Sequence, residues 1–164
     1  MATLIFEFGT FAKSTFPTPD DFLASLDHFF HGLPAGFRYS VEIRNPEYLG
    51  PAYFSLLASH NVAHVFNAWT RMPDVGKQIA LPDAFTADFS VARALLTKGR
   101  PYEQAVKTFE PYQETREPNL GVRDALSQIA RDAIKRRKPA FLFVNNRLEG
   151  NAPSTIEAVV EMLD

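Results

Sequence analysis

The chain has 164 residues, 46% of them hydrophobic and 22% charged, with a formal net charge of -2. This length and composition suffice for one hydrophobic core, so we expect a single domain over residues 1–164. The weak charge argues against binding to nucleic acid, and the lack of cysteine excludes disulfides, thiolate metal sites and cysteine nucleophiles.

The sequence gives no sign of a membrane segment. No stretch approaches the ~20 apolar residues that a transmembrane helix needs. The first apolar run is too short for a signal peptide and is interrupted by Glu7. We therefore expect a cytoplasmic protein without membrane contacts.

The first half of the chain alternates β-prone runs with helix signals. Residues 4–8 form the first such run. A helix starts at Thr18, with proline in its first turn and acidic residues where the helix dipole favours them. Residues 39–44 and 62–66 are predicted strands, and residues 51–60 are a predicted helix between them.

The second half is more irregular. Residues 70–85 have the proline and glycine content of a loop, and residues 85–93 are a predicted fourth strand. A short helix is expected near residues 102–109. Asn119 opens an amphipathic helix, whose apolar side chains recur at helical spacing.

The last part of the chain is a strand followed by a helix. Residues 140–144 are an apolar strand, and a helix is predicted to begin at Asn151. The hinge between them carries the polar side chains of Asn145, Asn146, Arg147 and Glu149. Ligands of parallel α/β proteins bind at this end of the strands.

Strands that alternate with helices indicate parallel βαβ units, and hence the α/β class. A closed parallel barrel needs eight strands, whereas about five are predicted here. We therefore expect a parallel βα repeat that resembles a partial TIM barrel.

Several motifs resemble the YecE-like family, also known as domain of unknown function 72. They are V-E-I-R-N-P at 41–46, T-A-D-F at 86–89 with Arg93 beyond it, and F-V-N-N-R at 143–147. The longer phrases at 65–73, 99–106 and 145–153 resemble one branch of this family.

The resemblance implies a TIM barrel of which this chain covers the C-terminal part. The opening section of typical members has no counterpart, and residues 4–8 resemble roughly their fourth strand. Many members carry Arg-x-His-Gly after the seventh strand. Here Arg93 is followed by Ala94, Leu95 and Leu96, so no role of that histidine carries over.

The strand ends supply a candidate site. Alternation along a strand places Glu42 and Arg44 on one face, and the apolar face should meet the helices. Glu7, Asn67 and Arg93 occupy equivalent late positions on their own strands, as do Asn145 and Asn146 at the hinge. We expect these side chains to converge at one mouth.

The residue types suggest roles. Arginines suit a phosphate or carboxylate ligand, and Glu42 and Glu7 are candidates for a general base. The further ligand-binding candidates are Arg44, Asn67, Arg93, Asn145, Asn146, Arg147 and Asn151. The alternative is a buried ion pair between Glu42 and Arg44 that only fixes the register of the strands.

The first turn of the last helix is a second candidate anion site. With Asn151 at the cap and Glu157 at capping-box spacing from Ser154, backbone N–H groups would remain free for an anion. The alternative is that Asn151 only caps the helix.

The histidines do not predict a site. His64 shares a strand face with apolar residues and is predicted to pack in the core. His28, His31 and His60 lie near helix C-termini, where surface roles are expected. No histidines stand at metal-ligand spacing beside the carboxylates, so the sequence does not support a metal site, and it identifies no cofactor.

Three functions remain open at this stage. The first is binding of, or catalysis on, a small anionic, polyol-like or phosphorylated ligand. The second is a metal-assisted phosphoesterase that acts on nucleic acid through Glu7 and Glu42. The third is a non-catalytic half-barrel that serves as an assembly module. Five parallel strands leave two open edges, so a homodimer is expected in any of these cases.

Overall fold

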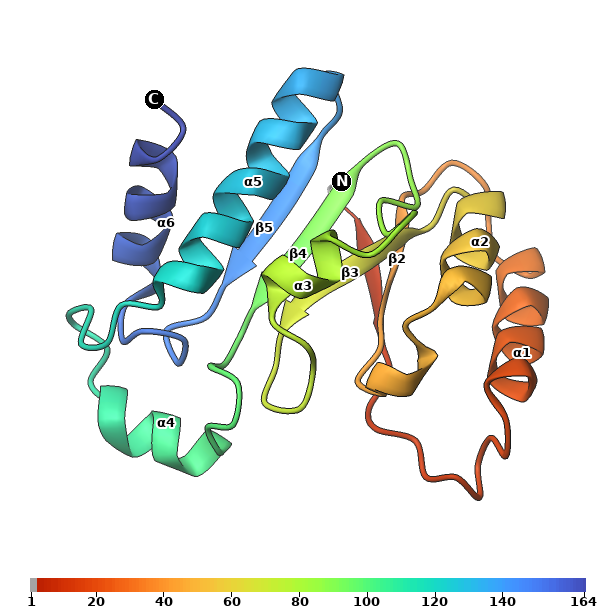
Figure 1. The fold of residues 1–164 in the computed structure, drawn as a ribbon, viewed down its shortest axis with the longest axis horizontal. Coiled ribbons are helices and arrows are strands. Elements are labelled where there is room, and N and C mark those ends of the chain that lie inside the picture. Colours follow the sequence, from red (N-terminus) through yellow and green to blue (C-terminus); the bar gives the residue numbers. More distant parts are fainter. Residues whose placement is uncertain (1–2) are drawn as a thin grey trace.

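The computed structural model describes residues 3–164 and contains one curled sheet of five parallel strands in the order β1-β2-β3-β4-β5. The strands are β1 (Leu4–Glu7), β2 (Tyr39–Glu42), β3 (Ala63–Ala68), β4 (Ser90–Ala94) and β5 (Ala140–Val144). Figure 1 shows the helices on the outside of the sheet. The prediction of a partial parallel barrel is confirmed.

Six α-helices and one 3₁₀ turn connect or follow the strands. They are α1 (Pro19–His31), η1 (Pro46–Tyr48), α2 (Pro51–Ser59), α3 (Val75–Ile79), α4 (Tyr102–Phe109), α5 (Leu120–Arg136) and α6 (Ala152–Glu161). Helices α1 and α2 lie on one flank, and α5 and α6 lie on the other (Figure 1). Helix α4 lies beyond the C-terminal ends of the strands (Figure 1).

The helix starts follow the capping residues of the sequence. The Thr18 side chain accepts a hydrogen bond from Asp21 N, and the Asp21 carboxylate accepts one from Thr18 N, which completes a capping box. Asn119 caps α5 by accepting from Val122 N. These predictions were local, and the structure confirms them.

Two predictions in the middle of the chain are wrong. The fourth strand begins at Ser90 rather than at residue 85, because Thr86 Oγ1 bonds the backbone at the start of β3: it accepts from His64 N at 2.8 Å and donates to Val62 O at 2.6 Å. Residues 70–85 are not all loop, since α3 forms within them. Gln78 of α3 is buried, and it bonds both the N–H and the carbonyl of Asn67.

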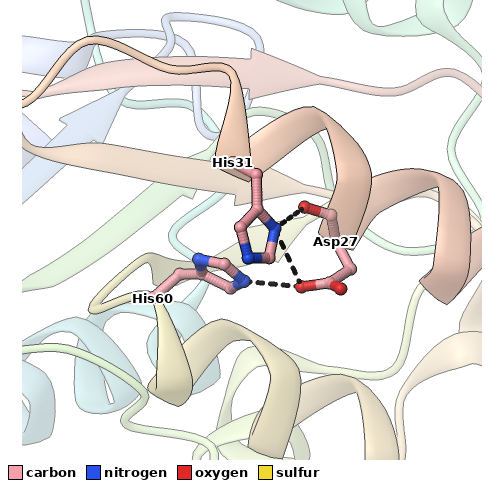
Figure 2. Close-up of side chains that lie close together, drawn as sticks. All are labelled: Asp27, His31 and His60. Carbon is pink, nitrogen blue, oxygen red and sulfur yellow. Dashed lines mark hydrogen bonds and ion pairs between the residues drawn. The ribbon is translucent and has the colours of Figure 1, made fainter.

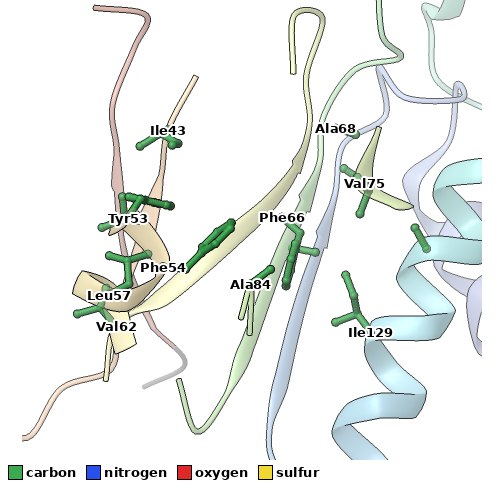
Figure 3. Packing of buried hydrophobic residues seen from close by; sticks show 14 of the residues in the cluster. Ile43, Tyr53, Phe54, Leu57, Val62, Phe66, Ala68, Val75, Ala84 and Ile129 are labelled. Atoms are coloured by element: carbon green, nitrogen blue, oxygen red, sulfur yellow. The ribbon is translucent and has the colours of Figure 1, made fainter. Parts of the chain in front are cut away.

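The core lies between the sheet and the outer helices (Figure 3). Phe66 of β3 packs there with Tyr53 and Phe54 of α2, while Ile129 comes from α5 (Figure 3). His64 is 1% exposed in this layer, with Nδ1 at 3.3 Å from the Tyr53 hydroxyl. Burial lowers the pKa of His64 to about 3, so the ring is neutral at pH 7. The prediction of a packed core histidine is confirmed.

Among residues 3–164, no helix is both long and apolar enough to cross a membrane.

Candidate ligand site at the strand ends

The parallel register aligns the polar ends of the strands. Val41 and Ile43 are buried in the helix-facing core, so Glu42 between them faces the interior of the half-barrel. Glu7 pairs with Glu42 across β1 and β2, and Asn67 pairs with Arg93 across β3 and β4. Strand β3 is longer than predicted, so Asn67 lies within it.

Two glutamates and two arginines form a closed ion-pair network, termed here the carboxylate–arginine cluster: Glu7, Glu42, Arg44 and Arg93. The Glu7 carboxylate bridges both arginines, with Oε1 at 2.5 Å from Arg44 Nη2 and Oε2 at 2.5 Å from Arg93 Nη1. Arg93 Nη1 also donates to Glu42 Oε2, and Arg44 Nε lies 3.4 Å from Glu42 Oε1. The two positive and two negative charges balance.

The two glutamates of the cluster differ in exposure. Glu42 is fully buried, whereas the Glu7 side chain is 38% exposed. Burial raises the pKa of Glu42 above its usual range; the neighbouring Arg93 offsets part of this effect, and the charge of Glu7 adds to it. Glu42 therefore retains a proton more readily than a glutamate in water, as an acid–base group requires.

Trp69 packs against Arg44 of the cluster. The guanidinium carbon of Arg44 lies 3.8 Å from the centroid of the Trp69 ring, at cation–π distance. This contact restricts the position of the guanidinium. Asn67 is fully buried beside Arg93, and its Oδ1 has no hydrogen-bond partner among residues 3–164.

A pocket of about 350 Å³ opens next to the cluster. Its lining comes from both edge strands and from β4: Ile5, Glu7, Arg93, Leu95, Phe143, Val144 and Asn145. The volume suits a small ligand. Another pocket, of about 410 Å³, lies between the segments that follow β3 and β4 and the start of α5, but it contains none of the four charged residues. The convergence of charges therefore favours the smaller pocket.

The backbone donors predicted to be free at the start of α6 are already bonded to side chains. Asn151 Oδ1 accepts from Ser154 N at 2.9 Å, and Asn146 Oδ1 accepts from Ala152 N at 2.8 Å. The residue between them is Pro153, which has no N–H. Ser154 occupies the third helical position, so Glu157 lies beyond the capping box. Asn146 and Asn151 thus satisfy the donors that an anion would need.

The other hinge residues divide between the site and the loop. Asn145 lines the pocket, and its Oδ1 accepts from Arg147 N at 3.0 Å. The Arg147 guanidinium stacks over the ring of Tyr102 on α4, with its central carbon 4.5 Å from the centroid. Arg147 is therefore directed to α4 and lies outside the carboxylate–arginine cluster.

Glu149 has a structural role that its sequence position did not reveal. It is fully buried and accepts from Arg123 Nε at 3.0 Å and from Arg123 Nη2 at 2.7 Å. Thr155 Oγ1 and Asn119 N donate to the same carboxylate. Burial alone would raise the pKa of Glu149, but the bonds from Arg123, Thr155 and Asn119 outweigh it and lower the pKa. Glu149 thus joins the starts of α5 and α6.

The structure also brings together Asp27, His31 and His60, which the sequence analysis treated as separate surface residues (Figure 2). Asp27 and His31 are four residues apart on α1, a spacing that places both on one helix face. His60 follows α2, and only the packing of α2 on α1 brings it to them.

Comparisons with known proteins identify relatives of the same fold. The family model described as "Protein of unknown function DUF72" matches residues 4–164. A DUF72 family protein from Thermotoga maritima is 15% identical to this chain, with a TM-score of 0.63. The alignment covers 97% of this chain and 56% of the Thermotoga protein. A DUF72 family protein from Enterococcus faecalis is 13% identical, with a TM-score of 0.59. Here the alignment covers 98% of this chain and 60% of the Enterococcus protein.

The chain therefore spans less than two thirds of the length of these solved relatives. At these identities the likeness shows the fold alone. No curated protein matches the chain.

Proposed function

The chain belongs to the DUF72 family, whose function is unknown, and we propose that its carboxylate–arginine cluster binds a small anion at the C-terminal strand ends. The anion would be a phosphate or a carboxylate. The observation that carries this proposal is the position of Glu7. Its carboxylate contacts Arg44 and Arg93 at 2.5 Å each, as an anionic ligand would.

Glu7 is the replaceable member of the cluster. It lies at the end of an edge strand, and its side chain is 38% exposed, whereas Glu42 is buried. An incoming anion would displace the Glu7 carboxylate and take over its bonds to the two guanidinium groups. Arg44 would already be oriented by Trp69, so little ordering would be needed.

Glu42 supplies the acid–base group of the proposed site. Its raised pKa and its contact with Arg93 would hold a carboxyl beside the bound anion, where it could exchange a proton with the ligand. The phosphoesterase alternative fits less well. Both glutamates accept hydrogen bonds from arginines, so a metal ion would have to displace guanidinium groups from each of them.

The test is a titration with inorganic phosphate and with acetate at constant ionic strength. Trp69 is the only tryptophan of the chain and stacks on Arg44, so its fluorescence reports binding directly. Because Glu7→Gln removes the competing charge, this variant should bind phosphate about tenfold more tightly than the wild type. Arg93→Lys should bind about tenfold more weakly, because lysine lacks the planar fork.

The matched control is Arg71→Lys, an arginine exposed two residues from Trp69. It should leave phosphate affinity unchanged. The proposal fails if Glu7→Gln is folded but shows no saturable response to either anion, or if Arg93→Lys and Arg71→Lys bind phosphate equally well.

The open side of the half-barrel supports a second proposal, that two copies associate through it. Strands β1 and β5 are the edges of the sheet, and Phe143 beside the pocket is 41% exposed. Exposed parallel edges and apolar side chains favour association.

Sedimentation at micromolar concentration should show a dimer that Phe143→Glu dissociates. The same change at Ile156, which is 46% exposed on α6, is the control. A wild-type monomer would contradict this second proposal.

A further inference from the structure

We propose that Asp27, His31 and His60 form a binding site for a divalent transition metal of the zinc class, where the ends of α1 and α2 meet. One ligand atom from each of the three residues lies within 4.8 Å of the others. Figure 2 shows the three side chains converging from the two helices. The site lies in the helix layer and does not depend on the carboxylate–arginine cluster.

The donor set determines the class of metal. Two imidazoles and one carboxylate are ligands of Zn²⁺, Ni²⁺ and Co²⁺, whereas Mg²⁺ and Ca²⁺ prefer oxygen ligands throughout. Three protein ligands leave at least one position for water. Zn²⁺ has no d-electron preference against four-coordinate tetrahedral geometry, so we expect it to bind more tightly than Co²⁺.

The hydrogen bonds around His31 resemble those of a metal-binding histidine. Its Nδ1 lies 2.8 Å from the main-chain carbonyl of Asp27, which can only accept, so Nδ1 must carry the proton. Nε2 then holds the free lone pair. Metal-bound histidines commonly donate their second N–H to a carbonyl in this way, which fixes the ring and its tautomer.

The second histidine would bind a metal in place of a proton. His60 Nε2 lies 2.7 Å from Asp27 Oδ1 and donates to the carboxylate. On binding, the His60 ring would change tautomer: Nε2 releases its proton to solvent, Nδ1 takes one up from solvent, and the freed Nε2 lone pair binds the ion. Tetrahedral zinc separates neighbouring ligand atoms by roughly 3.3 Å, so this contact must widen by about 0.6 Å. Exposed side chains allow it: Asp27 is 46% and His31 69% exposed.

The surrounding backbone favours a cation. Helix α1 ends at His31, and His60 is the C-cap of α2. The carbonyl ends of two helices therefore lie next to the three side chains, and each carries a partial negative charge. A bound ion would also link α1 to α2 next to Phe30, whose ring centroid lies 5.1 Å from that of His60.

The experiment uses the full chain without a histidine tag. Co²⁺ is titrated by visible absorption, and Zn²⁺ is then measured by competition and by its effect on the melting temperature. We expect one equivalent of Co²⁺, displacement by Zn²⁺, and a melting temperature that rises with Zn²⁺ because the ion binds the folded state. His31→Gln, His60→Gln and Asp27→Asn should each weaken binding by about tenfold or more.

The matched control is His28→Gln, which alters an exposed histidine in the same last turn of α1 but outside the cluster. It should bind Co²⁺ like the wild type. His60 also packs on Phe30, so if His60→Gln is less stable, the exposed His31→Gln decides. The proposal is overturned if the wild type binds no more tightly than roughly 1 mM. It is also overturned if His28→Gln loses as much affinity as His31→Gln.

Discussion

Glu42 and Glu149 are both fully buried and both face an arginine, yet their surroundings shift their pKa values in opposite directions. Around Glu149, a bidentate arginine, a hydroxyl and a backbone N–H fill the acceptor positions of the carboxylate. Glu42 shares its arginines with Glu7, and only Arg93 bonds it closely. Desolvation therefore wins at Glu42 and loses at Glu149.

The difference separates a structural carboxylate from a candidate functional one. A buried charge whose bonds are complete stabilises the fold around it, and it has no capacity left for a ligand. A buried carboxyl with incomplete bonds costs stability and remains available for proton exchange. The hinge at Glu149 is of the first kind, and the strand ends at Glu42 are of the second.

The largest expected effect is the difference in unfolding free energy between two variants, each of which removes one of the carboxylates of Glu149 and Glu42. Glu149→Gln should lower the free energy of unfolding by about 3–5 kcal/mol, because it leaves Arg123, whose side chain is only 15% exposed, without another carboxylate partner among residues 3–164. Glu42→Gln should stay within about 1 kcal/mol of the wild type, because Arg93 keeps Glu7. Urea denaturation at pH 7 measures both, and equal losses would contradict the distinction.

Gly150 should matter nearly as much, because it places Glu149. Its φ of +113° is unfavourable for other residues, and an added Cβ would lie 2.5 Å from Glu114 O. Gly150→Ala should therefore cost more than the roughly 1–3 kcal/mol that backbone strain alone produces. Gly36→Ala is the control: its φ is +88° but nothing lies within 4 Å, so it measures strain without a clash. Equal losses of unfolding free energy would argue against close packing at Gly150.

The pH dependence of stability should have opposite signs for the two residues. The folded-state pKa of Glu42 is raised, so its contribution is fully present below the ordinary value of 4.5 and is lost as pH rises through the raised pKa. That of Glu149 is lowered, so its contribution is present above 4.5 and is lost as pH falls through the lowered pKa.

Each unit of pKa difference corresponds to about 1.4 kcal/mol. The free energy of unfolding, measured from pH 3 to 8, should therefore rise for Glu42→Gln relative to the wild type as pH increases. For Glu149→Gln, the deficit in unfolding free energy relative to the wild type should shrink as pH falls into the acid range. Parallel curves for a variant and the wild type would contradict the assigned shift.

The smallest effect is expected at Trp69. Trp69→Leu keeps an apolar side chain but removes the ring under Arg44, a contact of about 0.5–2 kcal/mol. Phosphate affinity of the Glu7→Gln variant, measured by calorimetry, should fall several-fold on this change. Unchanged affinity would show that Arg44 does not need the stacking to hold its orientation.

The sequence by itself determined the local features. The helix starts at Thr18, Asn119 and Asn151 follow from side chains that bond backbone groups within three residues, so no distant partner is needed. Strand alternation placed Glu42 opposite the helix-facing side chains. Parallel βα order placed Glu7 and Arg93 at the same end of the sheet.

Only the tertiary structure decided which groups remain free and which are already satisfied. The side chain of Asn146 accepts the hydrogen bond of Ala152 N at the start of α6. Arg123 completes the hydrogen bonds of Glu149 from 26 residues away. His60 reaches Asp27 only because α2 packs on α1. Burial and hydrogen bonding between distant segments set the electrostatics of each polar group, and neither can be read from spacing along the chain.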